Sequence, residues 1–111
     1  MKINVNMITT TFDLPGYRIV QSCGIIRGIS VRSAGAVGGF VAGLQSLWAQ
    51  KNKTFTAMCE KTRSEAFDLL IEHAQELGAN AIIGVRFDAN EVNTVTTEIL
   101  AYGTAVIVEK I

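Results

Sequence analysis

Hydrophobic and polar residues follow regular spacings along most of the chain, and these spacings predict three β-strands. Residues 17–29 are rich in Ile and Val and alternate in part, which indicates a strand with a bulge or bend at Gly24. Residues 81–87 form the second predicted strand. One side of that strand carries Ala81, Ile83, Val85 and Phe87. Residues 94–108 are rich in β-branched side chains and predict a third strand, with a bulge expected at Gly103.

Two helices are predicted between the first and second strands. In residues 34–50 the large apolar side chains follow the i, i+3, i+4, i+7 spacing of an amphipathic helix. Gly35, Gly39 and Gly43 recur every four residues, so they lie along one face of this Gly-rich helix. Because each glycine weakens a helix, three in register suggest that a second backbone approaches closely there. A partly irregular, Gly-rich loop is the alternative for this segment.

The second predicted helix spans residues 54–77, after a short polar hinge at Lys51–Lys53. Its apolar positions keep the spacing of one buried face, namely Phe55, Cys59, Thr62, Ala66, Leu69, Leu70, His73 and Leu77. Its other face carries charges that we expect to be solvated, namely Lys61, Glu65, Asp68, Glu72 and Glu76. Gly78 is well placed to end the helix. A second polar segment, Asp88–Asn93, is expected to connect the last two strands.

The predicted order, β-α-α-β-β, indicates the fold class. It is an α+β fold with two layers, in which helices cover one face of a small antiparallel sheet. A chain of 111 residues is enough for one compact domain and not for two, so residues 1–111 are expected to form a single domain.

The composition indicates that this domain associates with copies of itself. Hydrophobic residues make up 49% of the chain and charged residues 18%, whereas an ordinary soluble domain carries roughly 25% charged residues. Apolar surface left on a 12.0 kDa monomer would aggregate, so we expect a homo-oligomer. Lys+Arg and Asp+Glu each number 10, so the chain lacks the basic field of a non-specific nucleic-acid-binding protein. Disorder is also excluded, because disordered chains are polar and highly charged.

No targeting or membrane-spanning segment is predicted. The N-terminus has a single Lys and no long apolar run, so it does not read as a secretory signal. Residues 33–50 carry no charge, but four glycines and the polar Gln45, Ser46 and Gln50 dilute their apolar character. We therefore expect a cytoplasmic protein that does not enter the membrane.

The donors that a soft metal ion would need are few and scattered. They are Cys23, Cys59 and His73, with no Cys-x-x-Cys pair. Cys59 and His73 lie 14 positions apart on one predicted helix, about 21 Å at 1.5 Å per residue. They cannot share an ion within one subunit, so a metal site would need ligands from neighbouring subunits. Otherwise both cysteines are expected to be buried, reduced thiols that pack as small hydrophobes.

One segment of the chain is suited to bind a small anion, and one side chain is a possible catalytic base. Arg32 and Ser33 precede the predicted helix start at residue 34, where free backbone amides and the helix dipole favour an anion, and Arg27 is nearby in sequence. His73 is the sole imidazole base, and no Gly-x-Ser-x-Gly or Cys-His signature accompanies it. The run Gly35–Gly39 matches neither the P-loop nor the dinucleotide-binding pattern. We therefore expect no enzymatic activity, and no cofactor is identified.

Four stretches of the chain together resemble one family of small bacterial proteins, the YbjQ-like family. They are Met7–Thr11, Gly16–Val20, Leu77–Phe87 and Ala101–Val106. The resemblance covers nearly the whole chain from Met7 onward, which makes residues 1–6 an N-terminal extension. It implies a dodecin-like β-α-β-β subunit, to which this chain adds the Gly-rich helix, and a ring-shaped homopentamer. It also implies a heavy-metal-binding label that has no agreed set of ligands. The chain departs from the family at residues 33–39, where a more polar segment is expected, so no ligand role carries over there.

These observations leave three functions open. A non-enzymatic homo-oligomer whose pore or subunit cleft binds a small ligand or an ion is favoured. A heavy-metal-binding protein whose ligands come from neighbouring subunits is the alternative. An enzyme would need a recognisable cluster of acid, base or nucleophile, and the sequence shows none.

Overall fold

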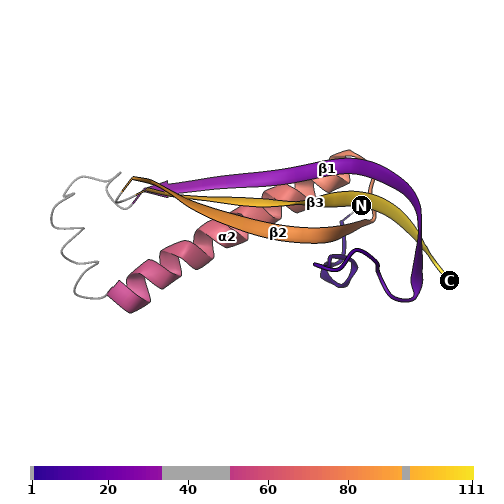
Figure 1. Ribbon diagram of the computed structural model, residues 1–111, viewed down its shortest axis with the longest axis horizontal. Helices are drawn as coiled ribbons and strands as arrows, with labels where there is room; N and C mark the ends of the chain where they lie inside the picture. Colours follow the sequence, from indigo (N-terminus) through magenta and orange to yellow (C-terminus); the bar gives the residue numbers. More distant parts are fainter. Residues whose placement is uncertain (1, 34–50, 94–95) are drawn as a thin grey trace.

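A computed structural model describes residues 2–33, 51–93 and 96–111 of the protein. The elements are η1 (Val5–Met7), β1 (Tyr17–Ser33), α2 (Lys51–Glu76), β2 (Ala81–Asn93) and β3 (Thr96–Lys110). The three strands form one antiparallel sheet in the order β1-β3-β2, and α2 lies across one face of it (Figure 1). The predicted α+β class with an antiparallel sheet is confirmed.

The boundaries of the elements differ from the prediction at two polar segments. The expected hinge at Lys51–Lys53 is wrong, because these residues already belong to α2. The expected connection at Asp88–Asn93 is also wrong, because β2 continues to its end at Asn93. Asp88 and Asn90 stand opposite Leu100 and Glu98 of β3, so backbone pairing keeps this polar stretch in the sheet. The predicted Gly-rich helix of residues 34–50, with its glycine stripe, lies outside the described residues and stays a prediction.

Two bulges decide which side chains face α2. The predicted irregularity at Gly24 is confirmed: the register of β1 shifts between Ser22 and Gly24, and Gly24 has a φ of 102°. The bulge expected at Gly103 lies instead on the opposite strand, where Gly84 and Val85 together oppose Gly103. Gly84 takes a φ of 62°, which glycine adopts without steric cost.

The bulge in β2 reverses the alternation of its side chains. Ile82 and Val85 pack in the cluster under α2, whereas Ala81 and Ile83 pack in a second cluster. The prediction that Ile83 and Val85 share one side is therefore wrong, because an extra residue between them turns the strand over by one position.

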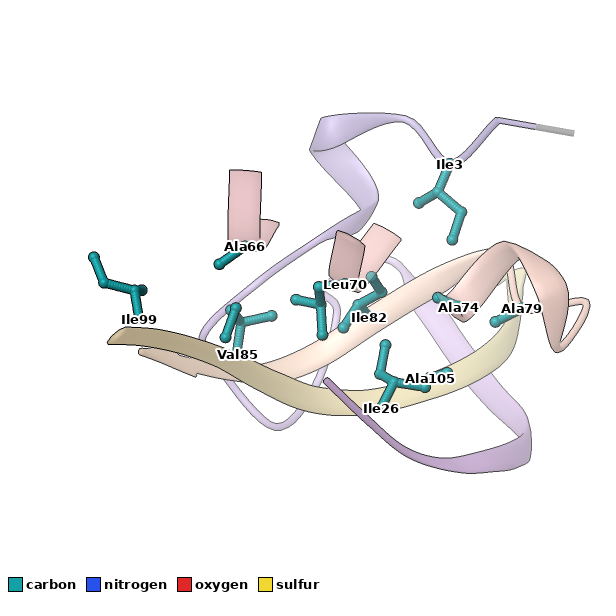
Figure 2. Packing of buried hydrophobic residues seen from close by; sticks show 11 residues of the cluster. Ile3, Ile26, Ala66, Leu70, Ala74, Ala79, Ile82, Val85, Ile99 and Ala105 are labelled. Carbon is teal, nitrogen blue, oxygen red and sulfur yellow. The ribbon is translucent and has the colours of Figure 1, made fainter. Parts of the chain in front are cut away.

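The core is divided between the two faces of the sheet. Under α2 lies the larger cluster, in which Ile26 of β1, Leu70 of α2 and Ile82 of β2 are almost fully buried (Figure 2). On the opposite face a smaller cluster joins the start of β2 and the end of β3 to Leu14, from the segment before β1. The N-terminal segment thus covers only the part of this face near the chain termini.

The buried face of α2 is narrower than its sequence predicted. The fully buried positions recur every four residues, at Thr62, Ala66, Leu70 and Ala74. Leu69 and Leu77, which we expected to be buried, are exposed. A three-stranded sheet is narrow, so only the row of side chains directly over it leaves the solvent.

The backbone of α2 approaches the sheet closely at Gly28 of β1. A Cβ atom at this position would clash with the carbonyl oxygen of Ala66 and would lie 2.6 Å from the backbone nitrogen of Leu70. Only glycine lets the helix backbone rest directly on the strand here.

A polar contact joins α2 to β1 beside this crossing. Ser30 is buried, and its hydroxyl donates to Oε2 of Glu65 over 3.0 Å. The guanidinium of Arg32 donates to Oε1 of the same carboxylate and forms an ion pair with it. Glu65 therefore faces the sheet, although its sequence position placed it in the solvated charge stripe.

Replacing Gly28 with Ala should destabilise the fold. The added methyl group meets helix backbone rather than a movable side chain, so we expect a loss of about 3 kcal/mol, the upper part of the range for overpacking. Chemical denaturation at a fixed protein concentration measures this. Ser22→Thr adds a methyl group at an exposed position of the same strand and should change stability by less than about 0.5 kcal/mol. Equal stability of Gly28→Ala and the parent would contradict the close approach.

Replacing Glu65 with Ala should cost more than the same change at Glu60. Glu65→Ala leaves the buried Ser30 hydroxyl without its acceptor, and we expect a loss of about 1–2 kcal/mol. Glu60 pairs with the exposed Arg63 on the same helix, and such surface pairs contribute little, so Glu60→Ala should cost about 0–0.5 kcal/mol. Thermal and chemical unfolding of both variants test the difference, and losses of equal size would remove the structural role given to Glu65.

Candidate functional site

A shallow pocket lies where the edge of β1 meets the second half of α2. It brings together two candidate residues that are 46 positions apart in the sequence, Arg27 and His73. The Nδ1 atom of His73 lies 3.4 Å from both the backbone nitrogen and the backbone oxygen of Arg27. A neutral ring with a bare Nδ1 accepts from the Arg27 N–H, and a ring protonated at Nδ1 donates to the carbonyl.

The pocket has a volume of about 350 Å³ and mixed chemical character. Its lining residues are Arg27, Gly28, Ile29, Leu69, Glu72, His73 and Glu76. Among the residues that the structure describes, no ion pair joins Arg27 to either glutamate. Glu72 and Glu76 thus line the pocket together with the apolar side chains of Ile29 and Leu69. The pocket is suited to a small polar molecule or an ion and is too shallow to enclose a large ligand.

The three residues of the predicted anion site are not equivalent in the structure. Arg32 is held by Glu65, so its charge is already partly neutralised. Arg27 is exposed and borders the pocket with His73. The side chain of Ser33, and the helix start that was to supply free amides, lie outside the described residues. The anion site therefore stays a prediction, with Arg27 as its available cation.

The two cysteines do not meet within one copy of the chain. Both are free thiols, and both are partly exposed, so the prediction that they are buried is wrong. Cys59 precedes Ala66 by seven helical residues, about 10 Å, and Cys23 precedes Gly28 by five strand residues, about 16 Å. Because α2 and β1 run in opposite directions, the two cysteines lie on opposite sides of the crossing (Figure 1). The two lengths therefore add, and the thiols are too far apart to share an ion.

The third metal candidate, His73, belongs to no metal-binding group among the described residues. His73 contacts the backbone of Arg27. Across the described ranges, no group of three or more His, Cys, Asp or Glu residues is placed to hold a metal ion. Any ion that used Cys23, Cys59 or His73 would need further ligands from outside the described part of one subunit.

Sequence reasoning missed the residues that shape this site. Gly28 forms part of the pocket wall and lets α2 approach, and Glu65 fixes the helix to β1. A glycine inside a strand rich in Ile and Val was a usable signal for close backbone approach. The Glu65 contact had no such signal, because it depends on how the helix is rotated over the sheet.

Among the described residues, no helix combines the length and the apolar character needed to cross a bilayer.

Relatives of the chain are bacterial proteins that match nearly all of its length. A UPF0145 protein of Chromobacterium violaceum is 52% identical over 103 residues, which are 93% of this chain and 88% of that protein. A UPF0145 protein of Solibacter usitatus is 52% identical over 99 residues, which are 89% of this chain and 88% of that protein.

A solved structure from Pediococcus pentosaceus shares the fold. It is described as a protein of unknown function of the DUF74 family, and it matches with a TM-score of 0.59 at 20% identity. The match covers 92% of this chain and 96% of that one. Residues 6–109 also match the profile of the YbjQ_1 family, described as "Putative heavy-metal-binding". The chain belongs to this family.

Proposed function

We propose that the protein is a cytoplasmic homo-oligomer that binds a small ligand or an ion and catalyses no reaction. The observation that carries the proposal is the open half of the sheet. On the face away from α2, the outer parts of β1 and β3 leave Ile25 82%, Val31 55%, Ile29 44% and Tyr102 39% exposed. An apolar surface of this kind on a soluble protein marks an interaction site.

The shape of a single copy supports association as well. Its radius of gyration is 17.1 Å, and its extents are 55 × 22 × 21 Å. A compact domain of this length has a radius of gyration of about 13 Å. A long, thin subunit keeps a large part of its sheet in water unless another copy covers it. Membership of the YbjQ-like family favours a dodecin-like subunit and a homopentameric ring as the form of this assembly.

The pocket beside Arg27 and His73 is the ligand site in this proposal. Glu72 and Glu76 offer negative charge, Leu69 contributes apolar surface, and Arg27 borders the pocket with its backbone against His73. The contact between the Nδ1 of His73 and the backbone of Arg27 holds the imidazole ring at the wall of the pocket. The pocket lies at the edge of the sheet, so a neighbouring copy could deepen it.

Heavy-metal binding across subunits is the second candidate. The description of the family favours it, and so does the partial exposure of both thiols. Thiolates are the ligands that soft metal ions prefer. In this candidate function, Cys23 or Cys59 of one copy completes a site with residues of the next copy.

The homo-oligomer should be visible by light scattering coupled to size exclusion at micromolar concentration. Ile25→Asp places a charge on the open face and should shift the protein toward smaller species. Ser22→Asp changes an exposed position of the same strand nearer the termini and should leave the assembly intact. A parent protein that stays a soluble monomer throughout this range would refute the proposed assembly.

Metal content separates the two candidate functions. After incubation with cadmium and desalting, we expect elemental analysis and native mass spectrometry to find no stoichiometric metal in the parent protein. Retention of a metal ion that is lost in Cys23→Ser or in Cys59→Ser would establish the second candidate instead. Circular dichroism of both variants controls for misfolding.

A further inference from the structure

The outer strands of the sheet each have one half without a backbone partner among the described residues. The N-terminal segment extends the sheet beside β2 only as far as Val85. Its bonds run from Thr9 N to Ile82 O over 2.9 Å, from Val85 N to Thr9 O over 3.1 Å and from Gly84 N to Thr11 O over 2.8 Å. Beyond Val85, the outer edge of β2 shows no further backbone hydrogen bond to any other described segment.

The free edge of β1 begins just after the residue that His73 covers. Arg27 turns its N–H and C=O away from β3, since both approach the His73 ring. Because backbone groups alternate sides along a strand, Ile29 and Val31 also turn theirs outward. Neither has a backbone partner on that side within the described residues.

The free edge of β2 follows from the same alternation. Tyr102 stands between Arg27 on β1 and Arg86 on β2. Since Arg27 turns its backbone groups outward, Tyr102 turns its own toward Arg86, and Arg86 turns inward. Phe87, Ala89 and Glu91 therefore present their N–H and C=O groups at the outer edge.

The two free edges lie at the same height on the sheet. Val31 of β1 and Asn90 of β2 both stand opposite Glu98 of β3. They also run in the same direction, because each is antiparallel to β3. A copy placed beside the first by rotation about an axis along the strands brings its β2 edge level with the β1 edge.

We propose that β1 of one copy pairs in parallel with β2 of the next copy, so that the sheet continues from subunit to subunit. This inference rests on the proposed homo-oligomer and specifies its interface. The contact is heterologous, because it joins two different edges, and repeated contacts of this kind form a closed ring when the rotation closes. Main-chain hydrogen bonds supply the contact, as in other cases of strand addition.

Charge favours this pairing over the pairing of like edges. The described strand β1 carries three arginines and no acidic residue, whereas the outer half of β2 carries Asp88 and Glu91 and no basic residue. Two β1 edges would bring arginines together, and two β2 edges would bring carboxylates together. In the heterologous pair, Glu91 lies level with Arg32, because both stand opposite Thr97, so Arg32 stands between this carboxylate and Glu65 of its own copy.

Arg86 of β2 and Arg27 of β1 would be like charges at this interface, but the side chain of Arg86 makes other contacts. Arg86 lies level with Arg27, but its guanidinium donates to the carbonyl of Thr10 over 2.8 Å and lies 5.5 Å from the ring centroid of Phe12. These contacts hold Arg86 toward the N-terminal segment of its own copy.

Paired cysteines test the interface in the full-length chain. The background is Cys23→Ser with Cys59→Ser, into which Val31→Cys and Asn90→Cys are introduced together. Within one copy these positions are two strand spacings apart, about 10 Å, which no disulfide spans. Ile29→Cys with Asn90→Cys tests a register shifted by two residues. Each single variant is a control, and native mass spectrometry with thermal unfolding checks that all of them fold and assemble like the background.

We expect mild oxidation of one of the double variants to give a ladder of covalent multimers on a non-reducing gel, and the single variants to give none. Dimers from Val31→Cys alone would show that two β1 edges meet and would overturn the proposal. An assembly that remains oligomeric while neither double variant forms a ladder would overturn it too, but would leave the proposed homo-oligomer standing. A monomeric background protein would refute both.

A charge reversal at Glu91 tests the same interface independently of introduced cysteines. Glu91→Lys should weaken the assembly by about fivefold per interface in a dilution series followed by native mass spectrometry, because an opposite-charge pair becomes a like-charge pair. Asp13→Lys makes the same change at an exposed position of the N-terminal segment and should leave the dissociation concentration within about twofold of the parent. Equal effects of the two variants would contradict a β2 edge in contact with an arginine-bearing strand.

Discussion

The contact of α2 with β1 at Gly28 is the constraint on which the rest of the structure depends. Without a side chain at this position, the helix backbone rests on an outer strand of the sheet. Glu65 then reaches Ser30 and Arg32 on one side of the crossing, and His73 reaches the backbone of Arg27 on the other. A bulkier residue at 28 would lift the helix and separate all of these groups. The pocket and the fixed tilt of the helix are thus consequences of one missing Cβ atom.

The same contact explains why a single copy leaves apolar surface and strand edges exposed. A single described helix placed over β1 covers one face of a narrow sheet, and the N-terminal segment covers only part of the other face. Apolar side chains such as Ile25 remain in water, and the outer halves of two edge strands keep backbone groups that no other described segment pairs. Exposed edges of this kind are normally paired or shielded. In the proposed assembly a second copy meets both needs at once, since it pairs the edges and continues the apolar face.

The strands, α2 and the fold class could be predicted because their patterns are local. Alternation marked β1 and β3, and helical spacing marked the buried row that includes Ala66. The predictions were wrong where contacts with residues distant in sequence override the local pattern. Pairing with β3 holds Asp88–Asn93 in a strand despite its polarity, and the bulge at Gly84 turns Val85 to the other face. For the candidate site, Arg27 and His73 were each noticed, but their meeting depends on where the helix crosses the sheet. No spacing within the sequence encodes that crossing.

Amide hydrogen exchange on the unmodified protein tests the central claim most directly, because it reads the free edges without changing them. At concentrations at which the assembly forms, the exchange rates of the outward amides of Ile29 and Val31 should lie within about tenfold of the rate of the inward Ser30 amide, which the sheet protects. The same should hold for Ala89 of β2. Exchange of these outward amides at the rate of exposed loop amides, while Ser30 remains protected, would show that the edges face water and would contradict the account.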